Sequence, residues 1–175
     1  CTLSDIVGQK ALLEDNAPLR RILAQDRLVS MIFWGPPGVG KTTLARVIAH
    51  DTNSEFVAFS ATMNGVAEIR EAAQKAKSRL ELQQKRTILM IDEIHRLNKS
   101  QQDVLLPWIE DGSFILIGAT TENPSFSLNS ALLSRARVFV LKSLDNTDLQ
   151  VILERALLKL NLKIDQSLYK IIVQS

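Results

Sequence analysis

The sequence is poor in the residues that mark secreted and membrane proteins. Its 175 residues contain one cysteine, which excludes an internal disulfide and favours a reducing compartment such as the cytoplasm. No apolar run is long enough to cross a membrane, and the first residues lack the basic and apolar regions of a signal peptide. We therefore expect a cytoplasmic protein that does not contact a membrane.

Strong charge of either sign is also missing, since 21 basic and 19 acidic residues leave a net charge of +2. Any contact with nucleic acid must therefore come from local patches. The most basic region, residues 66–86, contains Lys75, Lys77, Arg79, Lys85 and Arg86. Acidic residues are interspersed there, so a solvated helix face explains the region equally well. The sequence identifies no individual residue that contacts DNA.

A glycine-rich loop is the most informative segment. Residues 35–42 read Gly-Pro-Pro-Gly-Val-Gly-Lys-Thr, between a short apolar segment, 31–34, and a helical pattern, 43–49. This pattern in this setting is typical of a loop that cradles the phosphates of a nucleoside triphosphate with backbone N–H groups and a helix N-terminus. We predict that Lys41 contacts the β- and γ-phosphates of ATP and that Thr42 ligates Mg²⁺. The other nucleotide-binding residues predicted in the loop are Pro37, Gly38, Val39, Gly40 and Thr43.

An acidic pair, Asp92 and Glu93, ends the apolar segment 88–91. An acid at the carboxyl end of a buried strand lies beside the phosphate loop in such sheets, so we predict that Asp92 holds Mg²⁺ directly or through water. We predict that Glu93 polarises the attacking water as a general base, which distinguishes an ATP hydrolase from most kinases and GTPases with this loop. His95 has neither the spacing nor the neighbours of a metal ligand and is interpreted as a polar residue at a turn.

Apolar strands that alternate with helices predict an α/β fold with a parallel sheet covered on both faces. The predicted strands are 31–34, 55–60, 86–93, 113–118 and 137–141. The predicted helices are 9–25, 43–49, 66–84 and 100–109, with Pro18 dividing or kinking the first and Ser100 capping the last. From 145 onward helical spacing continues without a strand. We therefore predict a nucleotide-binding α/β domain, residues 1–143, followed by the beginning of a helical lid subdomain, residues 144–175.

Two further segments resemble the AAA+ ATPases. Residues 116–123, Leu-Ile-Gly-Ala-Thr-Thr-Glu-Asn, end the fourth strand with two hydroxyls, and residues 129–137, Asn-Ser-Ala-Leu-Leu-Ser-Arg-Ala-Arg, contain two arginines. The resemblance implies a five-stranded sheet of order 5-1-4-3-2, Thr121 as the sensor-1 residue near the γ-phosphate, and Arg135 as an arginine finger that acts in the neighbouring subunit's site. Arg137 is left open between a second finger and a structural role.

Residues 5–9, Asp-Ile-Val-Gly-Gln, resemble the segment of the AAA+ family that cradles adenine. The resemblance implies that Ile6, Val7 and Gly8 contact the base of the nucleotide.

Two longer strings narrow the resemblance to the replication-associated recombination protein A family, over about residues 3–160. They are residues 91–103, Ile-Asp-Glu-Ile-His-Arg-Leu-Asn-Lys-Ser-Gln-Gln-Asp, and residues 118–126, Gly-Ala-Thr-Thr-Glu-Asn-Pro-Ser-Phe. The resemblance implies a clamp-loader-like, DNA-dependent ATPase that acts at stalled replication forks on forked, gapped or single-stranded DNA.

The same resemblance implies a homotetramer that contacts single-stranded-DNA-binding protein, at the nucleoid of a bacterium or in the nucleus of a eukaryote. The family's sensor-2 arginine and tetramerisation region have no counterpart in these 175 residues. We therefore expect a fragment of such a protein, which by itself forms no tetramer.

The same AAA+ fold also supports other functions. A Holliday-junction branch-migration motor shares the Gly-Ala-Thr-Thr string, and a nucleotide-gated assembly module of the clamp-loader type would bind ATP with little turnover. Glu93 and Arg135 favour hydrolysis over the assembly module. A protein unfoldase is disfavoured because residues 60–66 contain no aromatic pore residue, with Met63 as the one substitute.

Overall fold

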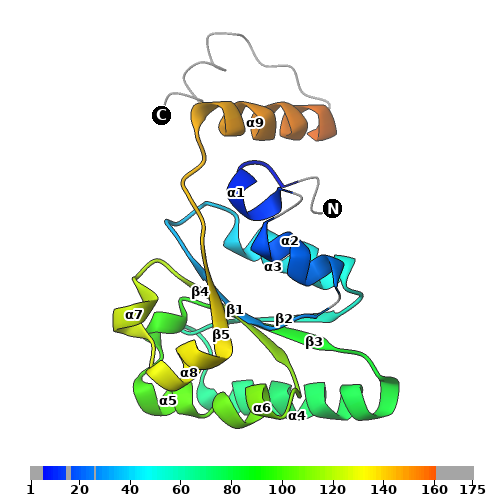
Figure 1. Cartoon of the computed structure of the whole chain (residues 1–175), viewed down its shortest axis with the longest axis vertical. Helices are drawn as coiled ribbons and strands as arrows, with labels where there is room; N and C mark the ends of the chain where they lie inside the picture. Colours follow the sequence, from blue (N-terminus) through cyan, green and yellow to red (C-terminus); the bar gives the residue numbers. More distant parts are fainter. Residues whose placement is uncertain (1–5, 15–16, 26, 161–175) are drawn as a thin grey trace.

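The fold is a single parallel β-sheet with helices on both of its faces (Figure 1), in a computed structural model that describes residues 6–14, 17–25 and 27–160. The five strands follow the order β2-β3-β4-β1-β5, and every neighbouring pair runs parallel. Counted from the other edge this is 5-1-4-3-2, so the predicted fold is confirmed. The strands are β1 (Ser30–Trp34), β2 (Glu55–Ser60), β3 (Thr87–Asp92), β4 (Ile115–Thr120) and β5 (Ala136–Val140).

The helices lie in the connections before, between and after the strands, because parallel strands need crossovers. They are α1 (Lys10–Leu13), α2 (Pro18–Ala24), α3 (Lys41–Asp51), α4 (Val66–Gln83), α5 (Lys99–Asp103), α6 (Leu106–Glu110), α7 (Pro124–Ser127), α8 (Ser130–Arg135) and α9 (Asn146–Leu160), with a short 3-10 helix, η2 (Ile94–Arg96). Of the helices in the described ranges, none has the length and apolar character needed to cross a membrane.

Each inner strand is buried on both faces because its side chains alternate between two apolar clusters. On β1, Met31 and Phe33 pack with residues of α2 and α3, whereas Ile32 packs with residues of α4 on the opposite face. Figure 1 shows the same division, with α2 and α3 on one side of the sheet and α4, α5 and α6 on the other. This packing fixes the carboxyl ends of β1, β3 and β4 side by side.

The predicted helix 9–25 is divided into α1 and α2, and Pro18 is the first residue of α2. Proline is favoured at this position because the first turn of a helix leaves its N–H groups unpaired in any case. The division is one of the two alternatives that the sequence left open.

The predicted helix 100–109 with Ser100 as its cap is wrong in both respects. Two short helices, α5 and α6, occupy this region, and Asn98 caps the first. The side chain of Asn98 accepts the N–H of Gln101 at 2.9 Å, and the side chain of Gln101 accepts the N–H of Asn98 at 2.8 Å. This reciprocal capping box satisfies two N–H groups that a helix start leaves unpaired, which Ser100 cannot do from inside the helix.

Beyond β5 the chain leaves the sheet and continues into α9, which Figure 1 shows beyond α1. A helix over 145–160 is thus present, while the helix expected from residue 165 lies outside the described residues. The division into domains at residues 143 and 144 stays a prediction.

Candidate functional site

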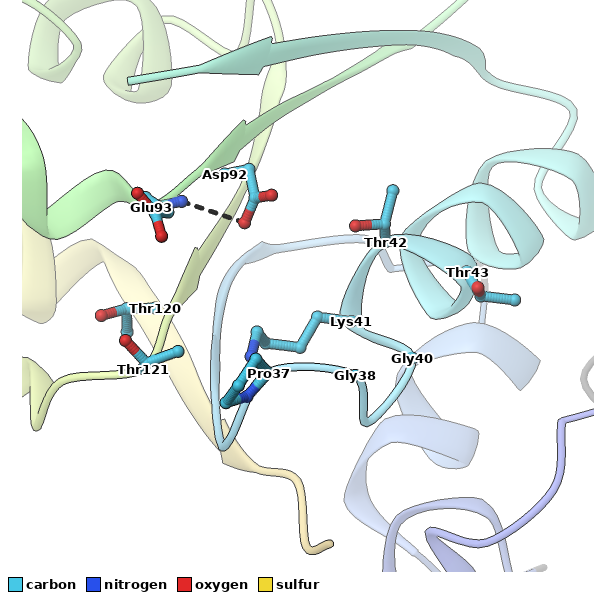
Figure 2. Close-up of a pocket in the computed structure, with 10 residues that line it drawn as sticks. All are labelled: Pro37, Gly38, Gly40, Lys41, Thr42, Thr43, Asp92, Glu93, Thr120 and Thr121. Carbon is cyan, nitrogen blue, oxygen red and sulfur yellow. Dashed lines mark hydrogen bonds between the residues drawn. The ribbon is translucent and has the colours of Figure 1, made fainter. Parts of the chain in front are cut away.

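A cavity of about 350 Å³ lies at the carboxyl ends of β1, β3 and β4 (Figure 2). Its lining combines the glycine-rich loop with the acidic pair and the two threonines, and consists of Pro37, Gly38, Gly40, Lys41, Thr42, Thr43, Asp92, Glu93, Thr120 and Thr121. In open α/β sheets, ligands bind at the carboxyl ends of the strands. They do so at the point where the connections that follow two neighbouring strands lead to opposite faces of the sheet. The structure thus brings together most of the residues that the sequence predicted.

The loop between β1 and α3 takes a conformation that needs glycine. Gly38 has φ +77° and Gly40 has φ +92°, both in the left-handed region. A Cβ atom at either position would meet no atom within 4 Å, so both glycines face open space. Val39 between them turns into the core, where it is 5% exposed, and does not line the cavity. Val39 therefore anchors the loop to the core, while Gly38 and Gly40 leave the loop open toward the cavity.

Lys41 is a buried cation at the wall of this cavity, with 9% of the residue exposed. Its Nζ donates hydrogen bonds to the carbonyl oxygens of Gly35 and Pro36, both at 2.7 Å. Burial lowers the pKa of Lys41, and the negative charge of Asp92 partly raises it again. Both hydrogen-bond acceptors are neutral, so an anionic phosphate oxygen would be a stronger acceptor than either.

Asp92 and Glu93 follow directly after the buried part of β3. Oδ1 of Asp92 accepts the N–H of Glu93 at 3.0 Å, and Thr42 faces the same cavity from the first turn of α3 (Figure 2). Glu93 has φ +52° and ψ +43°, a left-handed conformation that costs a non-glycine residue about 1–3 kcal/mol. Its carboxylate lies 3.9 Å from Nε of Arg96. Nothing in the sequence pattern predicts this backbone strain.

The described residues contain no cluster of three or more His, Cys, Asp or Glu side chains that would hold a metal ion by themselves. A carboxylate on Asp92 and a hydroxyl on Thr42 are nevertheless the oxygen donors that Mg²⁺ accepts, because this ion keeps several waters and binds through one or two carboxylates and substrate phosphates. The donor set therefore fits a metal that arrives with a nucleotide.

The two threonines at the end of β4 have different environments. Thr120 is 1% exposed, and its Oγ1 lies 2.9 Å from Nδ1 of His95. Thr121 is exposed and lines the cavity. The predicted strand ended at Gly118, whereas β4 continues to Thr120, which explains why one hydroxyl is buried. The partner of His95 was not predicted, since the two residues are distant in sequence and meet only because β3 and β4 are neighbours.

The structure does not bring every predicted site residue to the cavity. Arg135, the last residue of α8, was predicted to act in a neighbouring subunit's site; in this chain it lies outside the cavity and pairs with Glu110, at 2.5 Å between Nη2 and Oε1. Ile6 packs against the apolar cluster under α2 and α3, and neither Val7 nor Gly8 is among the lining residues described above. The roles of Arg135 and of residues 6–8 stay predictions.

Comparison with known proteins agrees with this geometry. The family model described as "ATPase family associated with various cellular activities (AAA)" matches residues 31–144. Replication-associated recombination protein A of Haemophilus influenzae is 54% identical over 155 residues, which are 89% of this chain and 34% of that protein. The same protein of Escherichia coli K12 is 55% identical with the same coverage, and ATPase WRNIP1 of Dictyostelium discoideum is 51% identical over 18% of its length. The chain spans about a third or less of the length of these relatives.

Solved structures of Thermotoga maritima RuvB share the fold. A RuvB mutant superposes with a TM-score of 0.79 at 28% identity, covering 98% of this chain and 58% of that one. The structure of the Thermotoga maritima RuvB Holliday junction branch migration motor has a TM-score of 0.72 at 31% identity, covering 94% of this chain and 55% of that one. Sheet order, phosphate loop and family match agree, and the chain belongs to the AAA family of ATPases.

Proposed function

We propose that this chain is the nucleotide-hydrolysing part of a DNA-dependent remodelling ATPase that acts at stalled replication forks. One observation carries the proposal. A single cavity presents the buried cation of Lys41 and the carboxylates of Asp92 and Glu93 together. A cation suits a triphosphate, and a carboxylate beside it suits the activation of water. The similarity to replication-associated recombination protein A supports a role in DNA metabolism.

Binding of ATP follows from the loop. The open faces of Gly38 and Gly40 leave room for the phosphates against the backbone N–H groups at the start of α3. Nζ of Lys41 exchanges its carbonyl acceptors for β- and γ-phosphate oxygens. Thr42 and Asp92 hold Mg²⁺, directly or through water. Bound Mg²⁺ neutralises charge that develops on the phosphate oxygens.

Hydrolysis needs a base and groups that sense the γ-phosphate. Glu93 takes the proton of the attacking water, and Thr121, exposed at the same cavity, hydrogen-bonds the γ-phosphate or that water. Arg135 acts in the site of a neighbouring subunit, and Ile6, Val7 and Gly8 contact adenine. Ion pairing from such an arginine is worth about 10³ to 10⁵ in turnover, which gives oligomerisation a catalytic purpose.

The proposed partners rest on the family resemblance of residues 91–103 and 118–126 rather than on the cavity. We propose forked, gapped or single-stranded DNA as the effector, single-stranded-DNA-binding protein as a partner and a homotetramer as the working assembly of the complete protein. The corresponding location is the nucleoid in a bacterial cytoplasm, or the nucleus of a eukaryote.

The test is the ATPase rate of the complete protein with and without forked or gapped DNA. Glu93→Gln should lower the rate by about 10²- to 10⁴-fold while a fluorescent ATP analogue still binds. Glu81→Gln, which neutralises an exposed acid on α4, is the matched control and should keep both properties. Turnover that survives Glu93→Gln, or that ignores DNA, would contradict the proposal.

A branch-migration motor is the second candidate, favoured by the superposition on Thermotoga maritima RuvB. It predicts that a four-way junction stimulates turnover more than a fork does and that the branch point of the junction moves. An assembly module of the clamp-loader type predicts DNA-bound complexes with ATP but little hydrolysis. The same DNA panel therefore separates the three functions.

A further inference from the structure

His95 is a buried imidazole between two segments that carry proposed catalytic residues. Its side chain is only 4% exposed. It belongs to η2, which begins directly after Glu93, and its Nδ1 lies 2.9 Å from Oγ1 of Thr120, the residue before Thr121. The imidazole therefore joins the segment after β3 to the segment after β4.

The second segment is a tight turn built on the Thr120 hydroxyl. Oγ1 of Thr120 accepts the N–H of Glu122 at 3.0 Å and lies 3.3 Å from the carbonyl oxygen of that residue. Nε2 of His95 lies 3.7 Å from Oε1 of Glu122, so the imidazole reaches both ends of the turn. Thr121 lies between these ends. Of the three residues of the turn, it is the one that is both exposed and part of the cavity lining.

The first segment is held in a conformation that its own backbone disfavours. Glu93 is left-handed, and the two residues that follow it are held by different contacts. Ile94 is fully buried, and a Cβ atom on Gly118 would approach its Cδ1 to 2.9 Å, so Ile94 is tightly packed. His95, the next residue, supplies the polar anchor through Thr120. Figure 2 shows Glu93 and Thr121 on the same side of the cavity, opposite Thr42.

We propose that His95 is a positioning residue that fixes Glu93 and Thr121 relative to each other. Its ring holds η2 against the turn 120–122, so that the base and the γ-phosphate sensor keep one geometry. The inference rests on the proposed roles of Glu93 and Thr121. A misplacement of a catalytic group by about 1 Å can cost on the order of 100-fold in rate, whereas phosphate binding on the far side of the cavity depends on Lys41 and the loop. Loss of His95 therefore lowers kcat and spares the affinity for ATP.

Two substitutions separate the hydrogen bonds from the bulk of the ring. His95→Leu removes both polar contacts and keeps an apolar group of similar size. His95→Asn keeps a polar atom at the position of Nδ1, next to Thr120, and loses only the contact with Glu122. Thr87→Val is the matched control, because this buried threonine loses a side-chain hydrogen bond with Arg79 at the opposite end of the same strand, β3.

The measurements are kcat, KM and the Kd of a fluorescent ATP analogue on the complete protein with DNA, together with the melting temperature. His95→Leu should lower kcat by about 10- to 100-fold with KM and Kd within about twofold, and His95→Asn should recover most of the loss. Thr87→Val should lower the melting temperature without lowering kcat. A His95→Leu protein with normal kcat would overturn the inference, whether or not ATP binding is weakened.

A double-substitution cycle keeps the inference testable if His95→Leu folds poorly. Thr120→Val removes the other half of the contact without changing the histidine, and should lower kcat in the same way. His95→Gln places its amide at the position of Nε2 and loses the contact of Nδ1 with Thr120. Because His95→Gln and Thr120→Val break this same contact, the double variant should lose less than the product of the single effects. Purely multiplicative losses would overturn the inference. If Glu93→Gln also keeps full turnover, the proposed function fails; if only His95→Leu keeps it, the positioning role alone fails.

Discussion

The side-chain amide of Gln9 is hydrogen-bonded to both backbone polar groups of Lys142. Nε2 of Gln9 donates to the carbonyl oxygen at 2.7 Å, and Oε1 accepts the N–H at 3.0 Å. Next to this pair, a Cβ atom on Gly8 would approach Leu144 Cδ2 to 2.6 Å and Asp148 Oδ2 to 3.0 Å. The segment proposed to contact adenine is therefore tied to the connection between β5 and α9.

Gln9→Ala should loosen this tie. Each of the two hydrogen bonds contributes about 0.5–1.5 kcal/mol, so we expect the free energy of unfolding to fall by about 1–3 kcal/mol. If residues 6–8 contact adenine, the affinity for ATP should fall as well, while the affinity for inorganic triphosphate stays unchanged. Urea unfolding and titration with both ligands measure the two effects. Gln74→Ala on the exposed face of α4 is the control, and equal behaviour of the two variants would contradict the coupling.

Lys41 should give the protein a characteristic pH dependence. Burial lowers its pKa in the folded state, so between that lowered value and the ordinary lysine value the unfolded chain binds more protons than the folded one. The free energy of unfolding should therefore rise with pH through this window, and the cost of burying the charged amine is fully present below it. Urea unfolding of the wild type and of Lys41→Met across this range measures the difference. A wild-type slope equal to that of Lys41→Met would contradict the assignment.

The same substitution tests phosphate binding. Charge-assisted hydrogen bonds are worth about 1.5–3 kcal/mol, so Lys41→Met should weaken ATP binding by about 10- to 100-fold or more. ATP should also reverse the pH effect in the wild type, because phosphate charge raises the pKa of the amine. Unchanged ATP affinity in Lys41→Met would show that the phosphates bind elsewhere.

Gly35 is required for close packing rather than for an unusual φ. A Cβ atom there would clash with the carbonyl oxygen of Leu141, whose N–H donates to the carbonyl oxygen of Trp34 at 2.7 Å. This backbone is held in place, so Gly35→Ala should destabilise the protein by about 1–3 kcal/mol. Gly65→Ala is the matched control, since the nearest atom to its Cβ would be 3.8 Å away. Thermal melting compares the two variants, and a similar change in both would contradict the packing argument.

The predictable part of the molecule is the part that local pattern determines. The apolar segment before the loop and the helix after it became β1 and α3, and the strand predicted at 55–60 became β2 with the same bounds. The acidic pair was predicted to lie beside the loop because carboxyl ends of parallel strands share one edge, and the cavity contains both. The strand order came from the family resemblance, since no local pattern encodes which strands are neighbours.

What the sequence missed depends on single side chains or on distant contacts. α7 and α8 are too short for a periodic pattern, although Asn123 and Asn129 cap them with side-chain hydrogen bonds to Ser125 and Leu132. Asparagine before a helical segment is the signal that would have found both, as it would have found the cap of α5. The contact of His95 with Thr120 has no such signal, because it arises only when β3 and β4 pair.

Substitutions of Arg135 and Glu110 test whether Arg135 acts between subunits. In the single chain the guanidinium of Arg135 pairs with Glu110 and also donates to the carbonyl oxygen of Ala131 at 2.9 Å. Both side chains of the pair are well exposed, so Glu110→Gln should change stability by less than about 1 kcal/mol. Arg135→Ala should lower the turnover of the assembled protein by about 10³-fold or more if the arginine completes a neighbour's site.

Mixing two inactive variants separates action between subunits from action within one. In a mixed oligomer, a site with an intact Glu93 on an Arg135→Ala subunit receives the intact Arg135 of a Glu93→Gln neighbour. Such a mixture should therefore regain ATPase activity that neither variant has alone, and Arg137→Ala in place of Arg135→Ala shows whether the second arginine serves the same purpose. Activity equal to the sum of the separate proteins would place the effect of Arg135 within its own chain, where its partner is Glu110 on α6.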